Sequence, residues 1–151
     1  MDTEHEIGHL FSDSLIEVIS TVTGLSLKVL AQDRDNDFEE ITGLMNLSGK
    51  KNGTLFLSAK ESAVRLICSR MLGIPYNDVT SDDAEDTLCE LVNMNAGNVK
   101  LRLSDTDYEF FLSQPFAISG EKMTIITKDK THVISRLVGN DEISIKMKIV
   151  Y

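Results

Sequence analysis

One segment in the middle of the chain carries polar residues on one side of a helical repeat and apolar residues on the other. The polar side holds Asp86, Glu90, Asn93 and Gly97. The apolar side holds Leu88, Leu91, Val92 and Val99. At about 100° per residue, the four polar positions fall within roughly 60° of one another. The pattern therefore predicts a helix that buries one side in a core and presents a polar stripe to solvent.

The glycine in this stripe needs an explanation. Gly inside a helix costs about 1 kcal/mol relative to Ala, and close approach of another molecule's backbone to Gly97 would justify that cost. Met94 and Leu101 project close to the stripe, so a partner can dock over it. Asn95 points toward the apolar side instead. If it is buried, it needs hydrogen-bond partners, and we expect them in the backbone of a neighbouring strand.

This arrangement resembles the signature of the CheC/CheX family of chemotaxis phosphatases. That signature has the pattern Asp/Ser-x-x-x-Glu-x-x-Asn, whose first position is an acidic residue or Ser. A Pro follows further along the chain. Here it reads Asp86, Glu90, Asn93 and then Pro115, and Gly97 after the Asn also fits. The resemblance extends loosely over the whole chain and is closest to CheX-type members, which carry a single working motif.

The resemblance implies an activity and two catalytic residues. Family members hydrolyse the aspartyl phosphate of CheY, a response-regulator receiver protein of chemotaxis or a related two-component pathway. Asn93 would place a water in line with phosphorus, and Glu90 would pair with a lysine of the receiver. The receiver brings its own Mg²⁺, so the resemblance implies no cofactor and no metal site in this chain. It also implies a homodimer.

The resemblance assigns supporting roles to the remaining motif residues. Asp86, Met94 and Gly97 would contact the partner, and Pro115 would shape the turn beside the motif helix. Two alternative functions remain open. One is a non-catalytic adaptor that binds a phosphorylated receiver, and the other is a structural module like the middle domain of the flagellar switch protein FliM. The intact Glu90/Asn93 pair argues against the switch module, whereas only an assay separates phosphatase from adaptor.

Length and charge limit the remaining possibilities. The 151 residues predict a single domain over 1–151, and the net charge of −9 disfavours nucleic acid and anionic membranes as partners. The start of the chain is acidic and polar, unlike a signal peptide, and no apolar stretch is long enough to span a membrane. Two cysteines inside predicted helices fit reduced, buried residues, so we expect a cytoplasmic protein.

Hydrophobic periodicity and turn residues predict three helices and seven strands. The helices are expected over 3–22, 60–72 and 81–103, with Ser81 as the N-cap of the last. The strands are expected over 25–31, 40–47, 54–58, 108–112, 123–128, 132–137 and 142–150. This order predicts an α+β protein with helices packed on the faces of a largely antiparallel sheet. Its two halves form a helix–strand–strand pseudo-repeat, and the resemblance implies the CheC-like fold.

Two further patterns lie in the first helix. Asp13, Glu17 and Ser20 repeat the motif spacing with Ser in the Asn position, and we interpret them as a solvated face. His5 and His9 belong to an H-E-x-x-H sequence, the pattern of zinc metalloproteases. That helix opens the chain without a scaffold before it, and no downstream segment indicates a third ligand. We therefore interpret them as two exposed histidines.

Overall fold

The computed structural model describes residues 3–32, 37–124, 126 and 132–151. Its helices are α1 (Thr3–Thr23), α2 (Glu61–Leu72) and α3 (Ser81–Arg102), with a short 3-10 turn η1 (Tyr76–Asp78) before α3. Its strands are β1 (Lys28–Ala31), β2 (Ile41–Gly49), β3 (Gly53–Ala59), β4 (Phe110–Phe111), β5 (Phe116–Ser119), β6 (Val133–Gly139) and β7 (Ser144–Val150).

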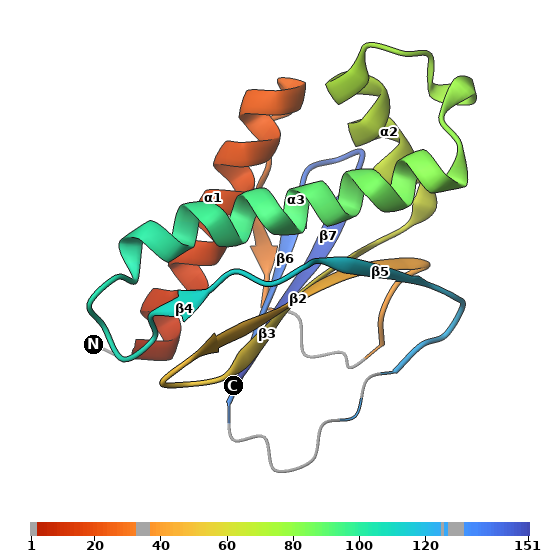
Figure 1. Cartoon of the computed structure of the whole chain (residues 1–151). Helices are drawn as coiled ribbons and strands as arrows, with labels where there is room; N and C mark the ends of the chain where they lie inside the picture. The colour runs from red at the N-terminus through yellow and green to blue at the C-terminus, as the bar shows by residue number, and fades with distance from the viewer. Residues whose placement is uncertain (1–2, 33–36, 125, 127–131) are drawn as a thin grey trace.

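The strands form one antiparallel sheet in the order β1-β6-β7-β3-β2-β4, with β5 also paired to β2. This confirms the α+β prediction. The described helices all pack on one face, however, rather than on both (Figure 1). Alternate residues of β2 show why: Ile41, Met45 and Leu47 join the core under the helices. Leu44 points the other way, into a small cluster with Phe38 and Phe56.

The pseudo-repeat is visible in the order of the strands. Each half runs from a long helix through short strands into a pair of long strands, α1 leading to β2 and β3, and α3 leading to β6 and β7. Short β1 of the first half pairs with β6 of the second, while β4 and β5 of the second half pair with β2 of the first. The two halves meet where β3 pairs with β7. Each half therefore completes the sheet of the other.

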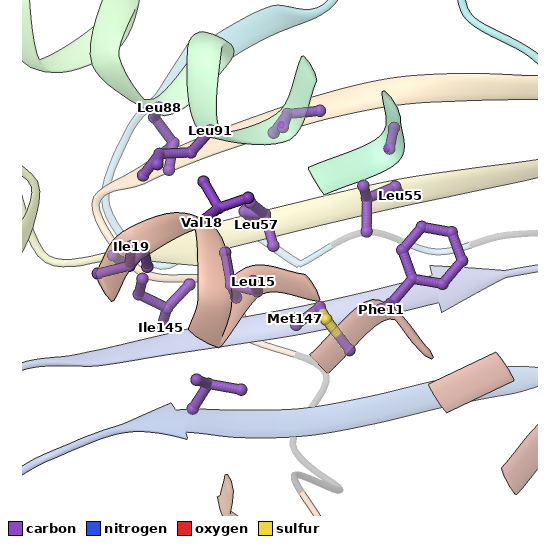
Figure 2. Close-up of a cluster of buried hydrophobic side chains, with 14 of the residues drawn as sticks. Phe11, Leu15, Val18, Ile19, Leu55, Leu57, Leu88, Leu91, Ile145 and Met147 are labelled. Atoms are coloured by element: carbon purple, nitrogen blue, oxygen red, sulfur yellow. The ribbon is translucent and has the colours of Figure 1, made fainter. Parts of the chain in front are cut away.

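The main core fills the space between the helices and the sheet (Figure 2). Phe11, Leu15 and Ile19 of α1 are fully buried. They lie in the same cluster as side chains from the central strands and α3. These include Leu55, Leu57, Leu88, Leu91, Ile145 and Met147. Burial of such side chains contributes about 1.5–3 kcal/mol each, so this cluster holds α3 against the sheet with a fixed side outward.

The start of α3 corrects one prediction. Thr80, not Ser81, is its N-cap, because the Thr80 hydroxyl accepts from the Asp83 N–H at 3.1 Å. The Asp83 carboxylate accepts in turn from the Thr80 N–H at 3.0 Å, which completes a capping box. The Ser81 hydroxyl instead donates to the Glu61 carboxylate of α2 at 2.9 Å. This hydrogen bond joins α2 to the first turn of α3.

Two strand predictions also differ from the structure. Strand β5 was not predicted, and it lies beside the first half of α3 (Figure 1). Half of the strand predicted over 123–128 lies outside the described residues. Within it, Thr124 forms an isolated antiparallel bridge with Asp37. The other predicted elements are present, with ends shifted by a few residues.

Candidate functional site

The polar stripe lies on the solvent side of α3, as its periodicity predicts. Asp86 and Glu90 are exposed, and Asn93 and Gly97 are partly exposed. The apolar side of the same helix is fully buried at Leu88, Leu91, Val92 and Val99. The core contacts therefore fix which way the carboxylate and the carboxamide of the motif point, and both are available to a docked molecule.

The packing of this chain gives no reason for the glycine in the stripe. Apart from its chain neighbours and the backbone of its own helix, a Cβ placed on Gly97 meets no atom of the described residues within 4 Å. Gly43 in β2 is the opposite case, because its Cβ would come within 3.0 Å of Val92 Cγ2, where α3 crosses the sheet. A glycine is needed at position 43 because α3 of the same chain packs closely against it. Gly97 leaves the surface beside Asn93 bare toward solvent.

Helix α1 supports the stripe from behind. The buried hydroxyl of Ser14 donates to the main-chain carbonyl of Asn95 at 3.3 Å. The Asn95 side chain is fully buried, as its position on the apolar side implied. Our expectation of a backbone partner from a neighbouring strand was wrong, since neither carboxamide atom has a hydrogen-bond partner among the described residues. The polar contact at this point is made by the Asn95 main chain.

The other motif positions lie around α3 at different depths. Met94 is half-buried and packs against the main core, so only part of it faces outward. Pro115 lies in the segment that joins β4 to β5 and runs alongside α3 (Figure 1). Strand β5, which follows that segment, is tied to the helix at its end, where the Ser119 hydroxyl donates to the Glu85 carboxylate at 2.7 Å.

Comparison with known families identifies the chain. A family model described as "Chemotaxis phosphatase CheX" matches residues 41–137, which include the whole of α3 and its stripe. The chain belongs to this family. The comparison with curated proteins gave no match.

Solved structures of CheX and CheC-like proteins share the fold over nearly the whole chain. A CheC-like superfamily protein from Shewanella sp. PV-4 is 27% identical, with a TM-score of 0.83 and coverage of 99% of this chain and 98% of that one. The chemotaxis protein CheX from Vibrio vulnificus is 23% identical, with a TM-score of 0.83 and coverage of 96% and 98%. FliM in a complex with SpeE from H. pylori is more distant, at 14% identity, a TM-score of 0.59 and coverage of 97% and 84%.

One of these structures contains a second protein. It is a CheX–CheY–BeF3–Mg complex from Borrelia burgdorferi, 17% identical to this chain, with a TM-score of 0.75 and coverage of 94% and 95%. At that identity the likeness shows the fold alone. FliM, which represents the alternative of a flagellar-switch module, matches this chain more weakly than the CheX structures do.

In this CheX-family chain, carboxylates surround the first half of α3. Glu40, Glu61, Glu85 and Glu121 line a cavity of about 240 Å³ between that half, β5 and the start of α2. Hydrogen bonds from Ser81 and Arg65 lower the pKa of Glu61. The site thus has an acidic N-terminal side, which suits a partner with basic groups.

Cys89 adjoins the stripe but is not suited to nucleophilic chemistry. Burial raises the pKa of its thiol, and the carboxylates of Asp86 and Glu85 raise it further. The thiolate is the reactive form of cysteine, so a raised pKa keeps Cys89 in its inert state near neutral pH. This leaves Glu90 and Asn93 as the accessible functional groups at the centre of the stripe.

The motif-like residues of α1 are also on the surface. Asp13, Glu17 and Ser20 are all exposed, which agrees with their interpretation as a solvated face. His5 and His9 are exposed too, and their rings lie edge to face with centroids 4.3 Å apart. His132 pairs with Glu4 of the same helix. No three His, Cys, Asp or Glu side chains within the described ranges gather as a metal site requires.

No helix in the described part of the chain is long and apolar enough to cross a membrane.

Proposed function

We propose that this CheX-family protein hydrolyses the aspartyl phosphate of a CheY-type receiver and does so through Asn93 and Glu90. The observation that carries the proposal is the placement of these two residues. They lie one turn apart on the outward side of a helix whose other side is locked into the core. Gly97 follows on the same stripe with open space where a Cβ would lie.

So sparse a site suits this reaction. An acyl phosphate is already activated, and phosphoryl transfer needs mainly positioning and charge stabilisation. The Asn93 carboxamide oxygen accepts a hydrogen bond from a water and directs a lone pair of that water at phosphorus. Mg²⁺ belongs to the receiver substrate and neutralises charge on the phosphoryl oxygens, so the proposal needs no cofactor in this chain.

Glu90 takes the docking role in this proposal. Its outward carboxylate pairs with a lysine of the receiver and sets the position of α3 over the phosphate. Asp86 lies one turn earlier on the same stripe and adds a supporting contact. Pro115 holds the segment beside α3 in place, and Met94 contributes its outward part to the contact.

A time course of phospho-receiver decay tests the function directly. With the protein present, the decay should be faster by orders of magnitude, and the gain should be lost in Asn93→Ala. Binding without acceleration would favour the adaptor, a non-catalytic protein that recognises the phosphorylated receiver. Absence of both binding and acceleration, across CheY-type receivers, would refute the proposed function.

The family membership also leads us to propose a cytoplasmic homodimer built from a single domain over 1–151. Light scattering on the purified chain measures the oligomeric state directly. A monomer at micromolar concentration would contradict the dimer without affecting the proposed catalysis by Asn93.

A further inference from the structure

The stripe on α3 ends in a large apolar side chain that the core does not use. Leu101 is 77% exposed, near the end of the helix. It lies one turn after Gly97, and at 100° per residue it is only about 20° around the helix from Glu90. Leu101 therefore extends the stripe, which runs from a carboxylate through a carboxamide and a bare glycine to an exposed leucine.

A second exposed apolar side chain stands next to this end of α3. Phe111 of β4 is 69% exposed, and the Lys100 ammonium lies 5.7 Å from the centroid of its ring. Strand β4 pairs with β2 through Ser48 and Gly49, so the ring is held at the edge of the sheet. Its neighbour Phe110 points the other way and is 1% exposed, in the core. Lys100 thus adjoins two exposed apolar side chains, Leu101 as its neighbour in the helix and Phe111 through its ring.

The distance from the catalytic position decides what can cover this pair. Leu101 follows Asn93 by eight residues, which is about 12 Å along a helix. A specific protein interface buries about 800 Å² on each partner, equivalent to a disc of roughly 16 Å radius. A receiver centred on Asn93 therefore reaches Leu101, and Phe111 beside the same turn.

We propose that Leu101 and Phe111 form an apolar anchor for the phosphorylated receiver, which presents a matching apolar surface about 12 Å from its phosphorylated aspartate. The inference rests on the proposed function, because it takes Asn93 as the point that meets the phosphate. The opposite end of α3 is acidic, with Asp82, Asp83 and Asp86. An apolar anchor at one end and carboxylates at the other fix the direction in which the receiver lies along the helix.

The test compares Leu101→Ser and Phe111→Ser with Leu72→Ser. Leu72 is 59% exposed at the end of α2, away from the stripe, so its variant controls for loss of an exposed leucine. The receiver is a CheY-type protein whose phosphate the wild type removes. Each anchor variant should raise KM for the phosphorylated receiver about five- to thirty-fold, while kcat stays within about two-fold. The control should match the wild type in both constants.

The outcomes separate this inference from the proposed function. A wild type that accelerates decay, together with anchor variants of unchanged KM, would overturn the anchor and leave the function intact. A wild type without activity or binding would overturn the function itself. If Leu101→Ser turned a dimer into a monomer in light scattering, the pair would belong to an interface with a second copy, and the anchor would again be overturned. Thermal denaturation confirms that each variant is folded.

Discussion

The hydroxyl of Ser14 in α1 donates a hydrogen bond of 3.3 Å to the main-chain carbonyl of Asn95 in α3. Both residues are buried, and Asn95 lies two positions after the proposed catalytic Asn93. The bond joins the two long helices on the side of α3 that faces away from the stripe. It therefore contributes to the rotational setting that points Asn93 outward.

Removing this bond should lower the stability of the protein. Ser14→Ala is expected to reduce the free energy of unfolding by about 0.5–1.5 kcal/mol, the usual net value of a buried hydrogen bond. Urea denaturation measures the change. Ser20→Ala, on the exposed side of the same helix, should stay within about 0.5 kcal/mol of wild type. Equal stabilities for the two variants would show that the Ser14 bond contributes nothing.

Asn93 is expected to act on rate more than on binding. Asn93→Ala should reduce accelerated dephosphorylation by roughly two to four powers of ten, because a positioned water is lost, while the complex still forms. Single-turnover decay gives the rate, and a titration with the receiver gives the affinity. Asn98→Ala is the matched control, since Asn98 is exposed on the same helix but off the stripe. Activity within a few-fold of wild type in Asn93→Ala would refute the site assignment.

Glu90 should affect binding as well as turnover. If its carboxylate pairs with a receiver lysine, Glu90→Ala should weaken the complex at low salt, and added salt should reduce the advantage of the wild type. Titrations at two ionic strengths check this. Glu17→Ala on α1 provides the comparison, and it should leave activity nearly unchanged. A large loss in Glu17→Ala, with the fold intact by circular dichroism, would reveal a second working site on α1.

The sequence was sufficient to predict α3 because the buried residues of this helix recur at helical spacing. Leu88, Leu91 and Val92 recur at helical spacing, so the outward direction of Asn93 follows without knowledge of the partner strands. The N-cap was misassigned by one residue. Thr80 is followed three positions later by acidic Asp83, and this spacing indicates a capping box with Thr80 as the N-cap. Ser81 is also an N-cap residue type, which is why the prediction was one residue off.

Strand β5 and the apolar pair could not be predicted in the same way. Phe116 and Ile118 of β5 remain 48% and 38% exposed at the sheet edge, so its four residues lack a clear alternation between core and solvent. Its partner β2 lies far back in the sequence. Phe111 likewise meets Lys100 only because β4 returns to the edge of β2. Such contacts are set by the topology of the sheet rather than by local pattern.

The contact between α2 and α3 should weaken in acid. Hydrogen bonds from Ser81 and Arg65 lower the pKa of Glu61, so the folded state holds its carboxylate in the charged form more strongly than the unfolded chain does. A lowered folded pKa stabilises the protein above the unfolded value of about 4.3, and the contribution is lost as pH falls through the folded pKa.

Glu61→Gln should therefore be less stable than wild type at pH 7, and the gap should narrow as the pH is lowered below about 4. Urea midpoints measured at both pH values give the difference. Ser81→Ala removes the larger cause of the shift and should reproduce part of the loss at pH 7. A gap that stays constant across this range would contradict the linkage to Glu61 ionisation.

Gly97 offers the sharpest separation of folding from docking. Because a Cβ added at this position would meet no described atom within 4 Å beyond its chain neighbours and its own helix backbone, Gly97→Ala should stabilise the protein by about 0.5–1 kcal/mol through helix propensity. Gly97→Leu should also fold at least as well as wild type, yet lose receiver binding and phosphatase activity, since the side chain stands where the receiver approaches.

Gly43→Ala is the opposite control: its Cβ would press on Val92 at 3.0 Å, so it should destabilise the fold. Thermal denaturation and a receiver titration on the same samples distinguish these effects. Full activity in a well-folded Gly97→Leu would mean that the receiver docks elsewhere than on the stripe of α3.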